Sequence, residues 1–352
     1  MLSVTFQKEL EEYQAKINLE LDNFFNKVIS ENNYGFNVKL LGVIKEFTMR
    51  GGKRIRPLLV LKGFQAVSIS KGIVNQKLEQ EVLKLSICVE LMQTSFLIHD
   101  DIMDKSELRR NKPTVHKILG ENMAILAGNI AMILAQKIIT DSNFSEEIKL
   151  KATNKFNEII QTTNYGQILD LQLSEKNIFE VNEDDINQIH LLKTAKYTIE
   201  GPLQLGVILA GDPDNVQDKL VEISKIALPL GRAFQIQDDL LGIFGSEEKL
   251  GKSVFSDIIE NKKTLLVWCA YMKANEEEKE FIKLVLGKQD ISEDEFSKLK
   301  EIIIKTGSKD YSKEKLIGLT EQVTHFINSS LLDRKTKNFL LNLAEFFVDR
   351  EF

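Results

Sequence analysis

Hydrophobic residues recur along this chain at helical spacing, and strand-like alternation is almost absent. Between residues 3 and 32, apolar positions return every three to four residues, as in an amphipathic helix that faces a core. Glycines and prolines are few and fall between such segments. The pattern predicts further helices over 38–48, 58–68, 122–140, 146–173, 184–192, 193–211, 214–244 and several parts of 262–352, and a long helix that starts at about residue 78 and carries the acidic segment near residue 100. Long helices with short connections predict an all-α bundle.

The totals place few limits on function. The chain has 352 residues, 43% of them hydrophobic and 28% charged, which supports a large core. We find no linker-like stretch and therefore expect one domain over residues 1–352. A net charge of −6 gives no reason to expect nucleic acid as a partner.

Cellular location is also constrained by the sequence. Cys88 and Cys269 fit no metal or redox spacing, so we expect both to be reduced and buried. The N-terminus lacks the apolar core of a signal peptide. No run approaches the ~18 apolar residues of a membrane span. We therefore expect a soluble, cytoplasmic protein.

Three aspartates gather in the segment LIHDDIMDKSELRR. Because a helical residue advances by about 100°, Asp100 and Asp104 share one face and Asp101 lies beside Asp104. Carboxylates this close repel one another unless a cation lies among them, and Mg²⁺ binds carboxylates together with substrate phosphate. Arg109 and Arg110 follow one to two helical turns later. A solvated charged face is the other interpretation, but the apolar residues before the motif favour a metal–diphosphate site.

A second acidic pair, Asp238 and Asp239 in FQIQDDLLG, closes another long apolar stretch. Acids at a helix C-terminus oppose the helix macrodipole, and a bound cation would compensate for them. One acidic pair says little by itself. The matched placement of both pairs predicts two facing walls of one pocket.

A basic turn, GGKRIRP, places Lys53, Arg54 and Arg56 between two glycines and the helix-opening Pro57. Basic side chains just before a helix N-terminus can form an anion cradle. A solvated basic turn is the commoner outcome for such a segment alone. Because the chain also has the two acidic motifs, we favour the anion cradle here.

Together these motifs resemble those of the trans-isoprenyl diphosphate synthases, the polyprenyl synthetase family. The resemblance rests on GGKRIRP, DDIMDKSELRR, KPTVH, ENMAILAGN, KTAKYT, FQIQDDLLG and GKSVFSDIIENKK, which occur in family order. The two ends of the chain carry only helical periodicity. The resemblance implies a single large antiparallel helix bundle of the isoprenoid synthase type with a central cavity, and a homodimer.

The resemblance also implies a Mg²⁺-dependent, head-to-tail condensation of isopentenyl diphosphate with an allylic diphosphate, with three ions in the site. The residues implied to bind isopentenyl diphosphate are Lys53, Arg56, Gln93 and Arg110. Those implied to bind the allylic diphosphate, or to lie along the reacting carbons, are Arg109, Lys193, Thr194, Gln235, Lys252 and Lys262. The implied metal ligands and their supports are Asp100, Asp101, Asp104, Asp238 and Asp239. Catalysis would rest on Asp100, Asp104, Lys193, Thr194, Gln235 and Asp238.

Two positions depart from the commonest family pattern. Gln93, seven residues before Asp100, stands where histidine is frequent, as it does in farnesyl diphosphate synthases. An amide can donate the same hydrogen bond without a charge. Gly242 stands where the second motif usually has its third aspartate, so this position has no metal role. The glycine variant occurs in archaeal-like members of the family.

Product length should depend on the turns below Asp100, because the growing chain runs down its own helix. Phe96 lies four residues earlier, within about 40° on the helical wheel, and Met92 lies one turn further down. Ser95 is small where short-chain members carry an aromatic ring. These residues favour geranylgeranyl diphosphate, with farnesyl and twenty-five-carbon products still open. The alternative that Phe96 and Met92 are ordinary core residues also stays open.

Two other functions compete with an active synthase. A non-catalytic partner subunit would keep the fold, but such subunits tend to lose acids of the first motif or the basic residues, and this chain retains both. A class I terpene cyclase shares the fold and the first motif. It carries an NDxxSxxxE-like second element, however, and this chain has QDDLLG.

Overall fold

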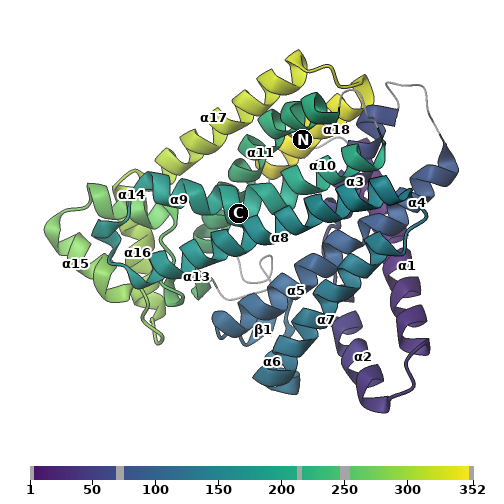
Figure 1. Ribbon diagram of the computed structural model, residues 1–352. Helices are drawn as coiled ribbons and strands as arrows, with labels where there is room; N and C mark the ends of the chain where they lie inside the picture. Colours follow the sequence, from purple (N-terminus) through teal and green to yellow (C-terminus); the bar gives the residue numbers. More distant parts are fainter. Residues whose placement is uncertain (1–3, 69–74, 212–215, 246–253, 349–352) are drawn as a thin grey trace.

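The computed structural model describes residues 4–68, 75–211, 216–245 and 254–348, and helices dominate all of these ranges (Figure 1). The all-α prediction is confirmed, with one short hairpin as the exception. The elements are α1 Val4–Ser30, α2 Gly35–Met49, α3 Ile55–Ser68, α4 Gln76–Ser86, α5 Cys88–Met103, β1 Leu108–Arg109, β2 Lys112–Pro113, α6 Val115–Leu119, α7 Glu121–Thr140, α8 Glu146–Glu175, the 3₁₀ helix η1 Ile178–Glu180, α9 Glu183–Ile189, the π-helix η2 His190–Glu200, α10 Gly201–Leu209, α11 Val216–Phe244, α13 Ser256–Ile259, α14 Leu265–Lys273, α15 Glu276–Val285, α16 Glu293–Lys305, α17 Ser308–Ser329 and α18 Arg334–Val348.

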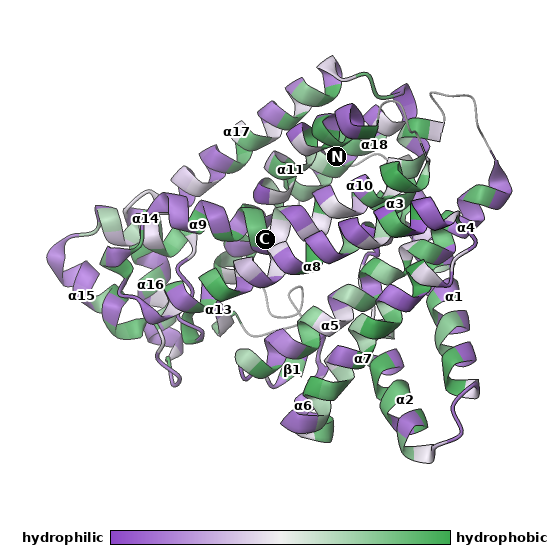
Figure 2. Cartoon of the chain, in the orientation of Figure 1, coloured by the Kyte–Doolittle hydropathy of each residue, from purple (hydrophilic) through white to green (hydrophobic). Residues whose placement is uncertain are grey.

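Two clusters of buried hydrophobic residues hold these helices together. The larger joins α1 to α8 with α10, α18 and the first part of α11. The smaller joins the last part of α11 with α14, α15 and α16, which gather at one end of the molecule in Figure 1. Hydrophobic and hydrophilic residues alternate along outer helices such as α1 and α17 (Figure 2), as expected for helices with one buried face.

The helix α11 belongs to both cores. Ile226 and Leu230 pack in the larger cluster, whereas Ile236 and Leu240 pack in the smaller one. The acidic pair Asp238 and Asp239 lies in this second part. The helix therefore fixes the second acidic motif relative to both halves of the molecule.

The structure corrects three sequence predictions. The helix predicted from residue 78 is broken at Ile87 into α4 and α5. The first motif does not continue as a helix, because α5 ends at Met103 and Arg109 lies on β1. The acids of the second motif do not end their helix, since α11 continues to Phe244.

The π-helix η2 crosses two neighbours at very short range. An added Cβ at Gly166 of α8 would lie 2.4 Å from the Lys193 nitrogen, and one at Gly231 of α11 would lie 2.4 Å from the Ala195 Cα. Both contacts require glycine, because real Cβ atoms do not approach other atoms so closely. The segment KTAKYT is thus held between α8 and α11.

Two described stretches, 76–103 and 121–140, are long and apolar enough to cross a membrane by length and hydropathy alone. In the folded protein, 67% of the first apolar window is buried, compared with 44% of the second. The expectation that no run approaches a membrane span was therefore too strong. The helix α7, residues 121–140, keeps an apolar face that its own chain does not cover.

Candidate active site

The two acidic motifs line one cavity of about 280 Å³. Asp100 enters it from α5, and Asp238 and Asp239 enter it from α11. The prediction that the motifs form walls of one pocket is confirmed. The remaining lining includes Arg56, Arg109, Asp170, His190, Lys193, Thr194, Tyr197, Gln235, Asp257, Lys262 and Lys263.

The first motif lies at the C-terminal end of α5. The helix closes with Asp104 as its C-cap, and the Asp104 backbone N–H donates to the Asp100 carbonyl at 2.8 Å. Carboxylates here oppose the helix macrodipole. Three cationic side chains from other elements, Arg109, Lys193 and Lys262, offset that charge.

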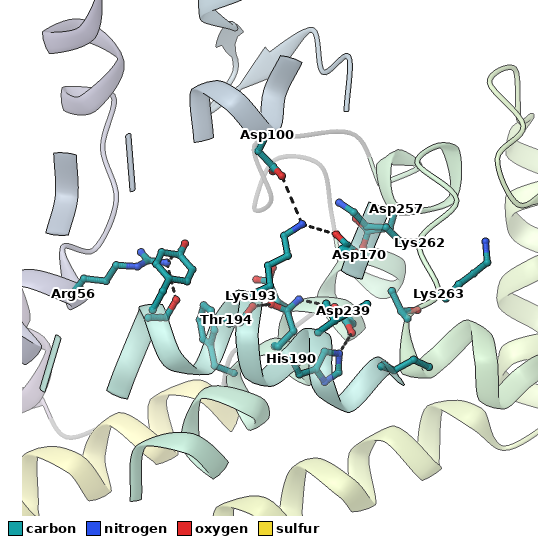
Figure 3. Close-up of a pocket in the computed structure, with 18 of the residues that line it drawn as sticks. Arg56, Asp100, Asp170, His190, Lys193, Thr194, Asp239, Asp257, Lys262 and Lys263 are labelled. Carbon is teal, nitrogen blue, oxygen red and sulfur yellow. Dashed lines mark hydrogen bonds and ion pairs between the residues drawn. The ribbon is translucent and has the colours of Figure 1, made fainter. Parts of the chain in front are cut away.

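Lys193 stands between carboxylates of two helices (Figure 3). Its Nζ lies 2.5 Å from Asp170 Oδ2 on α8 and 3.6 Å from Asp100 Oδ1 on α5. Lys262 forms the matching contact on the other side, 3.7 Å from Asp104 Oδ2, and it also pairs with Glu260. The predicted lysines therefore reach the predicted aspartates.

Burial perturbs the carboxylates strongly. It raises the pKa of Asp104 to about 7, and the nearby charges of Asp100 and Glu260 add to the effect while Lys262 opposes it. Burial also raises the pKa of Asp101 to about 6, against the influence of Arg109. A crowded group of carboxylates with raised pKa values is a site that a cation would stabilise.

Asp101 is turned away from the cavity. It is 1% exposed, and its Oδ1 accepts hydrogen bonds from Arg109 Nε at 2.9 Å and Nη2 at 2.5 Å. This bond holds Arg109 on the cavity wall. The geometry gives Asp101 a supporting position, and a role as metal ligand stays a prediction.

The hairpin β1–β2 brings the two basic segments together. Arg110 and Asn111 form its two-residue turn with φ values of 55° and 59°, as a type I′ turn requires. Arg110 Nη1 donates to the Gly51 carbonyl, and a Cβ at Gly52 would lie 3.0 Å from Arg110 Nη2. Arg110 therefore packs against the glycine turn.

The two arginines of the basic turn, Arg54 and Arg56, have different surroundings. Arg54 is buried, and it pairs with Glu90 at 2.6 Å and donates to the Thr48 carbonyl at 2.8 Å. Arg56 lines the cavity and donates to Tyr197 Oη at 2.6 Å and Thr198 Oγ1 at 3.0 Å.

Positive charges lie close together in the predicted anion cradle, which consists of Arg110 and the basic turn. Burial lowers the pKa of Arg110, and the charges of Arg54, Arg109 and Arg56 lower it further. Lys53 is exposed, with its Nζ 4.0 Å from the centre of the Phe346 ring. Crowded cations of this kind favour an anion beside them.

Two predicted binding residues are placed less directly. Gln93 is half-buried on α5, about two turns before Asp100, and it does not line the described cavity. Lys252 lies outside the described residues. Their binding roles stay predictions.

A chain of hydrogen bonds links η2 to α11. Thr194 Oγ1 donates to Gln235 Oε1 at 2.6 Å, and Gln235 Nε2 donates to Asp239 Oδ1 at 2.8 Å. His190 Nε2 lies 3.3 Å from Asp239 Oδ2. The chain fixes the orientation of the Gln235 amide through Asp239 Oδ1, and Asp239 remains one of the residues that line the cavity.

A second cavity of about 300 Å³ adjoins the first below Asp100. Asp100, Lys193 and Tyr197 line both cavities. The other lining residues are Ser95, Phe96, Leu97, His99, Met103, Asn129, Met132, Ile160, Thr163, Asn164 and Gln167. Of the predicted floor residues, Ser95 and Phe96 line it, whereas Met92 is fully buried outside the lining.

Comparison with known proteins now decides the family. The sequence profile of the polyprenyl synthetase family matches residues 37–303. The chain belongs to the polyprenyl synthetase family. It is a prenyltransferase of the isoprenyl diphosphate synthase type.

Individual members of the family resemble the chain over most of its length. It is 32% identical over 316 residues to the geranylfarnesyl diphosphate synthase of Aeropyrum pernix, covering 89% of this chain and 94% of that one. It is 33% identical to the geranylgeranyl diphosphate synthase of Saccharolobus solfataricus, covering 81% and 85%.

A solved structure shares the fold. Geranylgeranyl pyrophosphate synthase from Corynebacterium glutamicum, complexed with isoprenyl diphosphate and magnesium, superposes with a TM-score of 0.87. The two chains are 27% identical, and the match covers 97% of this chain and 99% of that one. The isoprenoid synthase fold expected from the sequence is confirmed.

Several polar groups of this polyprenyl synthetase site were not singled out in the sequence. Tyr197 and Asp257 lie within segments that carry the family resemblance, so position within a motif could have identified them. Glu260 lies in the same segment as Asp257, so the same signal applies to it. Asp170 and His190 have no distinguishing spacing, and only the packing of α8 and η2 brings these two to the site.

The donors present fit Mg²⁺ better than a transition metal. Among the residues that the structure describes, no three His, Cys, Asp or Glu side chains form a ready-made metal cluster. The first motif instead offers carboxylate oxygens on one helix face, where crowding and burial raise the pKa of Asp104. Mg²⁺ characteristically uses one or two carboxylates and completes its shell with water and substrate phosphate.

Proposed function

We propose that this chain condenses isopentenyl diphosphate head to tail with an allylic diphosphate in a Mg²⁺-dependent reaction. The observation that carries the proposal is the pair of adjoining cavities. The first combines acidic and basic side chains from α5, α8, η2 and α11, and the second continues from Asp100 along Phe96. This arrangement suits a substrate with a diphosphate head and a hydrocarbon tail.

The allylic diphosphate would lie beside Asp100 and Asp104. Lys193, Lys262 and Arg109 approach these carboxylates from three different elements, and they would contact the diphosphate oxygens. Asp100, Asp104 and Asp238 would hold Mg²⁺, which would supply Lewis-acid stabilisation of the leaving diphosphate. Lysine and arginine charges placed where negative charge develops lower the barrier further.

The allylic carbon that loses diphosphate becomes positively charged. The Gln235 Oε1 and Thr194 Oγ1 dipoles are held together by their hydrogen bond, so both can face that carbon without reorganising. The second cavity would place Phe96 and Met132 beside the hydrocarbon.

Isopentenyl diphosphate would bind at the basic cradle. Lys53, Arg56 and Arg110 would hold its diphosphate, with Gln93 donating a further hydrogen bond. Tyr197 fixes Arg56 through its hydroxyl, and its ring lies 4.4 Å below the guanidinium. Held there, the double bond of isopentenyl diphosphate can attack the allylic carbon, and loss of a proton completes the product.

Geranylgeranyl diphosphate is the product we propose. Phe96 lines the second cavity and packs edge-on against Tyr197, with ring centres 5.8 Å apart. The small Ser95 lines the same cavity, and we infer that it leaves room for a chain longer than fifteen carbons beside this aromatic pair. Farnesyl and twenty-five-carbon products are the other outcomes of a product analysis, and three Mg²⁺ ions remain the expected number.

We also propose that the protein is a homodimer. The helix α7 lines the second cavity with Asn129 and Met132 and exposes Leu126 and Ile133 on another face. Leu126 is 50% exposed and Ile133 is 62% exposed. A second copy that covered this face would bury apolar surface next to the product cavity.

The direct test of the metal site is Asp100→Ala. We expect inorganic diphosphate release to fall by more than about a hundredfold, with an unchanged melting temperature, because the change removes a metal ligand rather than core packing. Asp290→Ala, at an exposed turn, is the matched control and should retain full turnover. Wild-type activity in Asp100→Ala would rule out the proposed metal site.

A further inference from the structure

Position 242 lies on the cavity side of α11. It is one helical turn after Asp238, so a side chain at 242 would project from the same face as Asp238. Asp238 lines the first cavity. Gly242 places no side chain there, and α11 therefore brings one carboxylate fewer to this wall than an aspartate at 242 would supply.

The volume next to Gly242 is nonetheless occupied by a carboxylate. A Cβ built on Gly242 would lie 2.7 Å from Oδ2 and 3.6 Å from Cγ of Asp257, which are its nearest atoms among the described residues outside its own helix. A carboxylate oxygen of Asp257 therefore occupies space next to Gly242 that any side chain at this position would have to share.

A separate segment delivers Asp257 to this place. The short helix α13 carries it, and the Lys262 backbone N–H donates to the Asp257 carbonyl at 2.9 Å. The same turn carries Lys262 and Glu260 toward Asp104. Figure 3 shows Asp257 beside Lys262 and Asp170.

Asp257 is a buried acidic residue of the cavity wall, and its charge acts on a neighbouring lysine. It is 8% exposed and lines the cavity with Asp100 and Asp238. It also raises the pKa of Lys262, although burial of the lysine opposes this and Asp104 and Glu260 contribute more. A buried carboxylate kept at a cavity of this charge is costly unless cations share the site.

We propose that Asp257 supplies the carboxylate that position 242 lacks, and that it completes the α11 wall of the Mg²⁺–diphosphate site together with Asp238. The proposal rests on the proposed function. In this proposal, glycine at 242 leaves the space that the Asp257 carboxylate needs, so the site keeps its metal-binding capacity. Asp257 acts on the bound Mg²⁺–diphosphate as a positioning residue.

The experiment exchanges the two positions. Binding of Mg²⁺ in the presence of inorganic diphosphate is measured by calorimetry for the wild type, Asp257→Asn, Gly242→Asp and the double variant Gly242→Asp/Asp257→Ala. We expect Asp257→Asn to weaken Mg²⁺ binding about tenfold, as loss of a supporting carboxylate does. Gly242→Asp alone should also weaken it, because two carboxylates then compete for one volume.

The double variant is the decisive comparison. It moves the carboxylate from α13 to α11 without changing the net charge, and we expect binding within about threefold of the wild type. Asp290→Asn is the matched control for the amide substitution and should bind as the wild type does. Melting temperatures of all variants show that each is folded.

Two results would overturn the inference. In one, Asp257→Asn binds Mg²⁺ as the wild type does, which would reduce Asp257 to a structural partner of Lys262. In the other, the double variant stays as weak as Asp257→Asn. Failure of the proposed function is distinguishable, because it would show as a wild type without Mg²⁺–diphosphate binding or turnover.

Discussion

At the scale of single residues, helical periodicity predicts which acids share a face but not what each one contacts. Asp100 lines the cavity together with Asp238, and Asp104, one helical turn later, contacts the cavity-lining Lys262. Asp101 is adjacent in sequence yet is buried under Arg109. No local pattern foretells that bond, because Arg109 reaches back from a hairpin that the sequence did not predict.

Phe96 is the residue through which product length is best tested. In Phe96→Ala the second cavity should extend downward, and we expect the main product to lengthen by at least one five-carbon unit. The measurement is chromatography of the dephosphorylated products formed with one primer. Met92→Ala is the control, because Met92 is buried outside the lining and its truncation leaves Phe96 in place. An unchanged product from Phe96→Ala would show that this residue does not close the cavity.

At the scale of elements, the site depends on a π-helix that the sequence pattern misses. Apolar spacing predicts two helices meeting near Lys193, and the structure has η2 from His190 to Glu200 instead. A π-helix as short as this one leaves no recognisable repeat of apolar residues in the sequence. Such π-helical turns are frequent at functional sites. Here the wider turn sets Lys193 and Thr194 at the cavity between α8 and α11.

Gly166→Ala tests whether this placement matters. The added methyl would meet the Lys193 backbone, so η2 must shift. We expect kcat to fall at least about tenfold and the free energy of unfolding to fall by ~1–3 kcal/mol. Steady-state kinetics and chemical denaturation measure both.

The control for this change is Gly318→Ala on α17. A Cβ at Gly318 meets nothing within 4 Å, so alanine there should keep full activity and add about 0.5–1 kcal/mol of stability through helix propensity. Wild-type kinetics in Gly166→Ala would contradict the view that the α8–η2 contact positions Lys193.

At the scale of the whole molecule, composition and periodicity are enough to predict an all-α fold, and motif order is enough to predict the family. They do not predict the two cores or the way α11 joins them, because those depend on which apolar faces meet. The resemblance places Lys262 at the site, but none of these signals predicts that the same segment also brings Asp257 to the cavity. Such long-range placement is a property of packing.

The dimer proposal belongs to this scale. Light scattering of the purified wild type should give twice the 40.2 kDa chain mass. Ile133→Glu should shift the protein toward monomer, because a charge would be buried without a partner at the interface. Ile304→Glu, at a position of similar exposure on α16, should leave the mass unchanged. A monomeric wild type would contradict the proposal.

The most direct measurement is a product analysis of the wild-type protein. The purified chain is incubated with Mg²⁺, isopentenyl diphosphate and, in turn, dimethylallyl, geranyl and farnesyl diphosphate, and the dephosphorylated products are separated by chromatography. We expect an elongated prenyl chain, mainly of twenty carbons, and one inorganic diphosphate released for each isopentenyl unit added. No elongation of any of the three primers would contradict the proposed synthase activity and would favour a non-catalytic partner subunit.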